Sequence, residues 1–166
     1  MDLSYGEEYE AYRSEVRAFL AAHWPPRGEL AKLPKKEAAA RFRDLATGRG
    51  YLQRSVPRRY GGSEQPADPI RARVLQEEVA RSRAPMDPRG IGTMMLVPTL
   101  LEKGGEWQKE RFVPPTMRGE ITWCQGYSEP GSGSDLASLK TRAEIVGDEW
   151  VVNGQKIWTT QAHEAD

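Results

Sequence analysis

The stretch that decides the fold class is KTRAEIVGDEWVVNGQKIWTT, residues 140–160. Residues 140–146 alternate in character, and β-branched and aromatic residues return after the turn signal Gly147-Asp148. This pattern is typical of strands, and Asn153-Gly154 is a strong hairpin turn signal. We therefore predict an antiparallel meander with strands over residues 140–146, 149–152 and 155–160, and a shorter strand over residues 121–124.

The chain before this sheet has a helical period instead. Apolar residues recur at three- and four-residue intervals, and Pro or Gly residues separate the segments. Asp68-Pro69 favours a helix start, because Asp caps the first turn and Pro fits its first position. Pro98 predicts a kink or a first turn, and Pro114-Pro115 predicts a helix end. The expected helices cover residues 6–24, 35–47, 68–84, 91–103 and 105–113.

The order of elements, helices first and then an antiparallel sheet, indicates an α+β fold. We expect an N-terminal all-α helical domain over residues 1–119. Residues 120–166 are expected to begin an antiparallel β-barrel-like domain that is incomplete at Asp166.

Composition excludes several classes of protein. The 166 residues contain 24 Lys and Arg against 24 Asp and Glu, so a neutral chain offers no electrostatic footprint for nucleic acid. The lone Cys124 permits no internal disulfide, and His23 and His163 are too far apart in sequence to indicate a metal site. No apolar run reaches the length of a membrane span, and the first five residues do not resemble a signal peptide. A cytoplasmic protein is expected.

A glycine- and serine-rich loop, WCQGYSEPGSGSDL, occupies residues 123–136. Glycines let backbone amides converge on one point, and such concave amide arrangements bind phosphate. The loop has neither the Lys of a P-loop nor the spacing of a dinucleotide-binding fold. On local composition alone, a plain surface turn is the favoured interpretation.

The complete motif shifts the preference from a plain surface turn to a functional loop. Residues 128–135, SEPGSGSD, resemble the first signature of the acyl-CoA dehydrogenase family, and residues 153–160, NGQKIWTT, resemble its second flavin-contacting segment. Upstream, residues 60–62, YGG, and 106–112, EWQKERF, resemble elements of that family's helical domain. The resemblance covers nearly the whole chain and holds in order.

The resemblance implies FAD as cofactor and gives roles to nine residues. Gln125, Gly126, Tyr127 and Ser128 would lie along the isoalloxazine ring. Gly133 and Ser134 would meet the pyrophosphate, with Ser134 also near the CoA of the substrate. Trp158 would pack on the ring beside Thr159, and Thr160 would place its hydroxyl at flavin N5. The protein would orient and tune the flavin, which carries the redox chemistry.

The family reaction introduces an α,β double bond into an acyl-CoA thioester, by base-assisted removal of the α-proton and hydride transfer to flavin N5. The base is usually a Glu from a later helical bundle, so we expect it beyond Asp166 and assign no catalytic residue within the chain. Residues 1–166 alone are expected to be inactive and to bind FAD weakly. The implied partners are an acyl-CoA, electron-transfer flavoprotein or a similar acceptor, and further copies in a dimer or tetramer.

Two other functions stay open at this level. The chain could be a truncated, non-catalytic binding module, or part of a flavin oxidase or monooxygenase of the same fold. Tyr127 departs from the smaller residue of many family members, which leaves the size of the substrate open.

Several residues also have plainer interpretations. Trp158 could be a buried sheet aromatic, and Thr160 an ordinary β-former. Met94 and Met95 could line an acyl pocket, but core packing is the expected role. Cys124 is expected to be a buried strand residue. Glu129 and Asp135 could suggest an acid/base pair, but the resemblance implies that they shape the loop.

Overall fold

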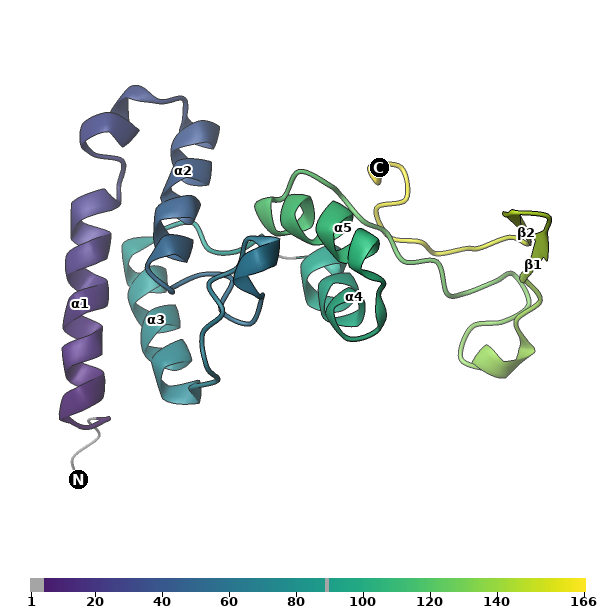
Figure 1. Ribbon diagram of the computed structural model, residues 1–166, viewed down its shortest axis with the longest axis horizontal. Coiled ribbons are helices and arrows are strands. Elements are labelled where there is room, and N and C mark those ends of the chain that lie inside the picture. The colour runs from purple at the N-terminus through teal and green to yellow at the C-terminus, as the bar shows by residue number, and fades with distance from the viewer. Residues whose placement is uncertain (1–4, 89) are drawn as a thin grey trace.

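The computed structural model describes residues 5–88 and 90–166, and the sequence interpretation of the first four residues lies outside that range. Within these described residues, five α-helices precede one antiparallel hairpin, which confirms the α+β class (Figure 1). The helices are α1 (Glu7–His23), α2 (Lys35–Gly48), α3 (Pro69–Ser82), α4 (Val97–Lys103) and α5 (Glu106–Arg118), and the strands are β1 (Arg142–Val146) and β2 (Glu149–Asn153). Short 3-10 turns lie at Gly28–Lys32, Arg58–Tyr60 and Leu136–Ser138, and a π-helical turn at Gly92–Leu96 precedes α4.

The first core joins α1, α2 and α3. Val16, Phe42 and Val74, one from each helix, are almost fully buried in it. Helix α3 begins as its sequence predicts, since the Asp68 carboxylate accepts a hydrogen bond from the backbone N–H of Arg71 at 2.8 Å. Local capping and apolar periodicity therefore place these three helices correctly.

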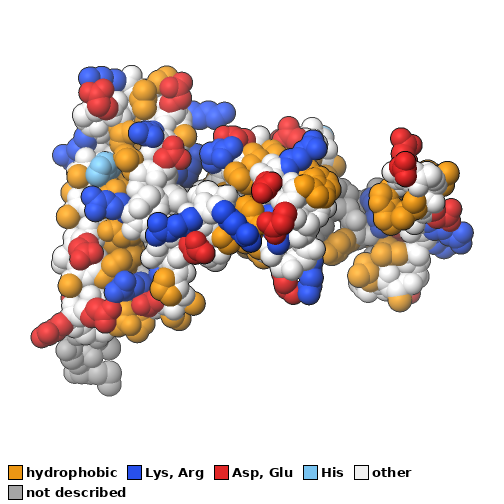
Figure 2. All heavy atoms as spheres, viewed as in Figure 1, with side chains coloured by type: hydrophobic (Ala, Val, Ile, Leu, Met, Phe, Trp, Pro, Cys, Tyr) orange, Lys and Arg blue, Asp and Glu red, His pale blue; other side chains and the backbone are white. Residues whose placement is uncertain are grey.

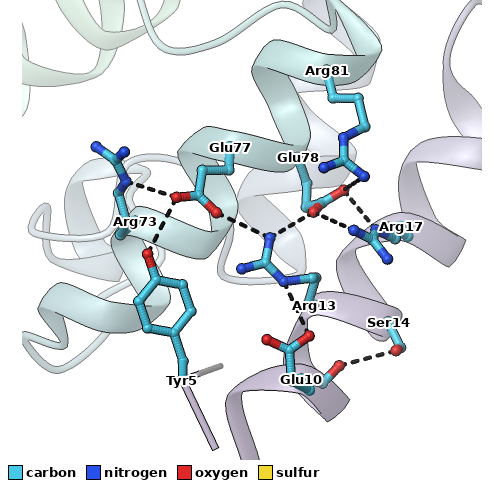
Figure 3. A network of polar contacts seen from close by, with 9 residues as sticks. All are labelled: Tyr5, Glu10, Arg13, Ser14, Arg17, Arg73, Glu77, Glu78 and Arg81. Carbon is cyan, nitrogen blue, oxygen red and sulfur yellow. Dashed lines mark hydrogen bonds and ion pairs between the residues drawn. The ribbon is translucent and has the colours of Figure 1, made fainter. Parts of the chain in front are cut away.

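A cluster of charged side chains joins α1 to α3 through hydrogen bonds and ion pairs (Figure 3). Glu78 is only 2% exposed, and its carboxylate accepts hydrogen bonds from Arg13 at 2.7 Å and from Arg17 at 2.8 Å. Burial alone would raise the pKa of Glu78, but the hydrogen bonds from Arg17 and Arg13 hold it below its usual value. Beside it, Glu77 accepts from Arg13 and Arg73. Glu78 is thus a buried charge that is kept ionised by its partners.

The second core lies between α4 and α5 and positions the start of the loop region. It contains Val97, Val113 and Met117, together with Tyr60 from the turn before α3. The Tyr60 hydroxyl donates to the Glu106 carboxylate at 2.7 Å, which joins the turn to the start of α5.

The prediction that Pro114-Pro115 ends the fifth helix is wrong, because α5 continues to Arg118. Val113 and Met117 are buried on either side of the prolines, and their packing holds the helical path. Gly119, in the left-handed conformation, then ends the helix. Pro98 lies in the first turn of α4, as one of its two predicted roles requires.

The hairpin pairs Arg142 with Asn153 at its open end and Val146 with Glu149 beside the turn. Every residue of both strands is exposed, including Ile145, Trp150 and Val152. Apolar side chains accordingly gather on the hairpin in Figure 2, at the end of the molecule opposite α1.

The predicted strands over residues 121–124 and 155–160 are not formed. Residues 121–124 pack against α5 instead, where the Trp123 indole lies edge-on to Phe112 and donates to the Thr116 hydroxyl at 2.9 Å. In residues 155–160, Trp158 has a φ of +54°, which breaks an extended path. Asn153-Gly154 makes no second hairpin turn. Gly154 instead allows the backbone to approach Thr141, with which a Cβ would collide.

Candidate functional site

The two segments singled out by sequence, residues 125–128 and 155–160, lie beside each other although about thirty residues separate them. The backbone N–H of Ile157 donates to the carbonyl of Ser128 at 2.9 Å. The Lys156 ammonium donates to the carbonyl of Tyr127 at 3.0 Å. Gly126 faces Lys156 so closely that a Cβ there would stand 3.2 Å from the Lys156 Cγ. The chain thus builds one site from two distant segments.

The rest of the Gly/Ser loop turns back toward residues 155–160. Glu129 and Ser132 exchange two backbone hydrogen bonds, at 2.7 and 3.0 Å, and close a tight turn around Pro130-Gly131. The Ser132 hydroxyl donates to the carbonyl of Asp135. Gly133 then passes the Trp158 ring, which a Cβ would meet at 3.6 Å. The loop therefore brings Gly133 next to the second segment.

Glu129 is the buried anchor of this arrangement. Its carboxylate accepts from the backbone N–H groups of Lys140 at 2.6 Å and Thr141 at 2.9 Å, and from the Lys156 ammonium at 2.9 Å. The hydrogen bond from Lys156, followed by those from Thr141 and Lys140, lowers the pKa of Glu129 to about 2. Glu129 therefore shapes the loop and is a poor proton acceptor, whereas the Asp135 side chain is exposed and makes no hydrogen bond among the described residues.

The donors at the site are free to meet a ligand. Among residues 5–88 and 90–166, the hydroxyls of Ser128, Ser134, Thr159 and Thr160 form no hydrogen bond with protein. Tyr127 is exposed, and Trp158 exposes 81% of its surface. Hydroxyl donors and glycine amides suit phosphate, and a free indole suits a flat aromatic ring. The residues present therefore fit a flavin nucleotide.

Some plainer interpretations of single residues are wrong. Trp158 is no buried sheet aromatic, and Thr160 lies outside any strand. Met94 and Met95 are exposed, so they are not core residues. The π-helical turn carries them outward, and the Met95 sulfur accepts a hydrogen bond from the Gln125 side-chain amide at 3.4 Å. Cys124 is partly buried but belongs to no strand.

Lys156 is a site residue that the sequence interpretation missed, and Met95 is one for which it favoured core packing over a pocket. A signal for Lys156 was available, since Lys156 and Glu129 are opposite charges on the two segments expected to meet. For Met95 the sequence offered an acyl pocket as one role, but its contact with Gln125 was not predictable, because that contact depends on how the π-helical turn and the loop pack.

Residues 5–88 and 90–166 hold no group of three or more His, Cys, Asp or Glu side chains that could ligate a metal ion. They also hold no helix that is long and apolar enough to cross a membrane.

Two family models match the chain. The acyl-CoA dehydrogenase N-terminal domain matches residues 6–120, and the acyl-CoA dehydrogenase middle domain matches residues 124–166. Among curated relatives from Mycobacterium tuberculosis, acyl-CoA dehydrogenase FadE34 is 39% identical over 95% of this chain and 20% of its own length. Acyl-CoA dehydrogenase IpdE1 is 38% identical over 95% of this chain and 42% of its own length. The chain thus spans less than half the length of these relatives.

Solved structures also match the whole of this chain with less than half of their own length. The ChsE4-ChsE5 complex from Mycobacterium tuberculosis aligns with a TM-score of 0.61 and 32% identity, over all of this chain and 42% of that chain. The Tcur3481-Tcur3483 steroid acyl-CoA dehydrogenase aligns with a TM-score of 0.60 and 33% identity, over all of this chain and 43% of that one. The first of these structures is a complex of ChsE4 with ChsE5.

Proposed function

We propose, from the premise that this chain belongs to the acyl-CoA dehydrogenase family, that the Gly/Ser loop and residues 155–160 form part of an FAD site. The reaction proposed for the whole protein is the introduction of an α,β double bond into an acyl-CoA thioester. The observation that carries the proposal is the contact between the two segments, in which Ile157 donates to Ser128 at 2.9 Å beside a free Trp158 ring.

Nine residues would hold the cofactor. Residues 125–128 and Trp158 offer surfaces for the isoalloxazine ring, and Gly133 and Ser134 offer an amide and a hydroxyl for the pyrophosphate. Ser134 is also proposed to face the CoA of the substrate. Thr159 and Thr160 supply hydroxyls beside the ring. When bound, the flavin supplies the acceptor for the hydride that leaves the substrate β-carbon, while these residues bind and orient the reactants.

The α-proton needs a separate base. Glu129 is unsuited, because its pKa of about 2 and its bonds to Lys140, Thr141 and Lys156 leave no basic oxygen free. We therefore place the base on a carboxylate outside residues 1–166.

The domain bounds are proposed separately. The helical domain is assigned to residues 1–119, and the β-domain to residues from 120 onward.

The 166-residue chain by itself is proposed to be inactive and to bind FAD weakly. Tyr127, Ser134 and Trp158 are all exposed, and water at an open site weakens each polar contact to a ligand. The exposed apolar hairpin supports assembly with further protein, for which the ChsE4-ChsE5 complex among the solved relatives is a precedent. An acyl-CoA and an acceptor such as electron-transfer flavoprotein complete the proposed partners.

The test is anaerobic reduction of the flavin by an acyl-CoA in the full natural protein that carries this chain. Thr160→Val removes one hydroxyl without changing shape, and loss of such a donor to a developing charge lowers the rate by about tenfold to a thousandfold. Thr122→Val is the matched control, because the Thr122 hydroxyl makes no hydrogen bond within residues 5–88 and 90–166 and lies outside the site. Equal bleaching rates in the two variants would remove Thr160 from the proposal.

A further inference from the structure

Two charged side chains tie the two segments of the proposed flavin site together. The Lys156 ammonium donates at once to the Glu129 carboxylate at 2.9 Å and to the backbone carbonyl of Tyr127 at 3.0 Å. Glu129 comes from the Gly/Ser loop and Lys156 from the segment after β2. One ammonium group therefore joins residues that are far apart in sequence.

The same carboxylate also fixes the start of the hairpin. Its other contacts are the backbone N–H groups of Lys140 and Thr141, which lead directly into β1. Three pieces of chain consequently meet at Glu129, namely the loop, the entry to β1 and the return from β2. No other carboxylate in the described ranges accepts two backbone N–H groups and a side-chain ammonium together.

The burial of the pair makes it a strong constraint. The Glu129 side chain is 7% exposed and that of Lys156 is 28% exposed, so water competes weakly for the bond. The bond to the Tyr127 carbonyl also sets the orientation of the following peptide, since the C=O and N–H of one planar trans unit point in opposite directions. The Ser128 N–H is thereby turned away from Lys156.

We infer that Glu129 and Lys156 form a clamp that positions residues 125–128 against residues 157–160, so that both segments meet the flavin in one register. The two residues do not touch the cofactor. Their effect on it passes through the peptides that they hold. This inference rests on the proposed flavin site, while the clamp itself can be tested without flavin.

The first measurement is amide hydrogen exchange in the full natural protein without added flavin. Lys156→Met keeps the length of the stem and removes the charge. We expect faster exchange at the Lys140, Thr141 and Ile157 amides, because the carboxylate loses its main partner and the two segments separate. Lys140→Met is the matched control, since the Lys140 side chain is exposed and only its backbone joins the clamp.

The second measurement is FAD affinity. Loss of a charge-assisted hydrogen bond that holds the site corresponds to a rise of about tenfold to a hundredfold in the dissociation constant for Lys156→Met. Glu129→Gln is expected to weaken binding in the same direction, and Lys156→Arg, which keeps the cation, is expected to restore most of the affinity. The control Lys140→Met is expected to bind like the wild type.

The outcomes separate the clamp from the flavin site. Unchanged exchange at the three amides in Lys156→Met overturns the clamp, whatever the affinity for FAD. Altered exchange with unchanged FAD affinity overturns its positioning role. A wild-type protein that takes up no FAD contradicts the proposed function, while the exchange data still decide whether the clamp exists. If Lys156→Met does not fold, Glu129→Gln and Lys156→Arg supply the same comparison.

Discussion

Replacing Glu78 by Gln is expected to loosen α1 from α3. The substitution keeps the shape of the side chain but removes the negative charge that faces Arg13 and Arg17. Removing the charge of one partner in a buried pair typically costs about 3–5 kcal/mol. Two features reduce this cost here, since Arg17 is 48% exposed and Arg13 keeps its bond to Glu77. We therefore expect a loss of about 2–3 kcal/mol in the free energy of unfolding.

Urea denaturation followed by far-ultraviolet circular dichroism measures that loss, and thermal melting gives a second readout. A loss of this size lowers the melting temperature by about 4–12 °C for a chain of this length. Glu29→Gln is the matched control, because the Glu29–Lys32 pair is also short, at 2.6 Å, but both side chains are exposed. The control is expected to change stability by less than about 1 kcal/mol. Equal small losses in the two variants would refute the structural role of the buried cluster.

Three further predictions concern stability. Asp68→Ala removes the cap of α3 and is expected to cost about 1 kcal/mol in a urea titration, with no change if the Arg71 N–H finds another partner. Gly154→Ala is expected to disturb the approach to Thr141, seen as faster exchange in β1 and β2, and an unchanged exchange pattern would contradict the close contact. Stability is expected to fall as the pH drops below about 4.5, because the lowered pKa of Glu78 means that the unfolded chain takes up the proton first. A melting temperature independent of pH between neutrality and pH 3 would contradict the last prediction.

The helices show where local sequence rules suffice and where they do not. Asp68-Pro69 acts through contacts within one turn, so the start of α3 follows from the sequence. Pro114-Pro115 is a strong local signal for a helix end, but the burial of Val113 and Met117 outweighs it. That burial depends on packing against α4 and Tyr60. Whether a proline ends a helix thus depends on packing that lies far away in the chain.

The sheet shows a second limit of prediction from the sequence, namely that β-forming residues do not by themselves make a strand. β-forming residues in 155–160 predict a strand, but a strand needs a neighbour along its length. Within the described chain this segment makes one backbone hydrogen bond to the loop, from the Ile157 N–H to the Ser128 carbonyl, and Trp158 turns out of the extended conformation. Residues 142–153 form their hairpin because both partners and the turn are local.

The two segments of the candidate site were predictable from the sequence, and the opposite charges of Glu129 and Lys156 were a signal for their contact, but the full set of bonds that joins them was not predictable. The family resemblance pointed to residues 125–128 and 155–160, and the structure brings them into contact. Their contacts with a flavin stay predictions. The role of Lys156 depends on a carboxylate that also binds two backbone amides, and this arrangement appears only once the loop is folded.

The most direct test of the central claim is a titration of the flavin-free full natural protein with FAD, beside the variant Trp158→Ala. If residues 125–128, 133–134 and 158–160 form the site, the wild type takes up one equivalent of FAD and turns yellow. The variant is expected to bind about tenfold or more weakly, because base and ring stacking on an aromatic side chain contributes about 1–3 kcal/mol. A wild-type protein that stays colourless and takes up no FAD, or a variant that binds as tightly as the wild type, would contradict the account.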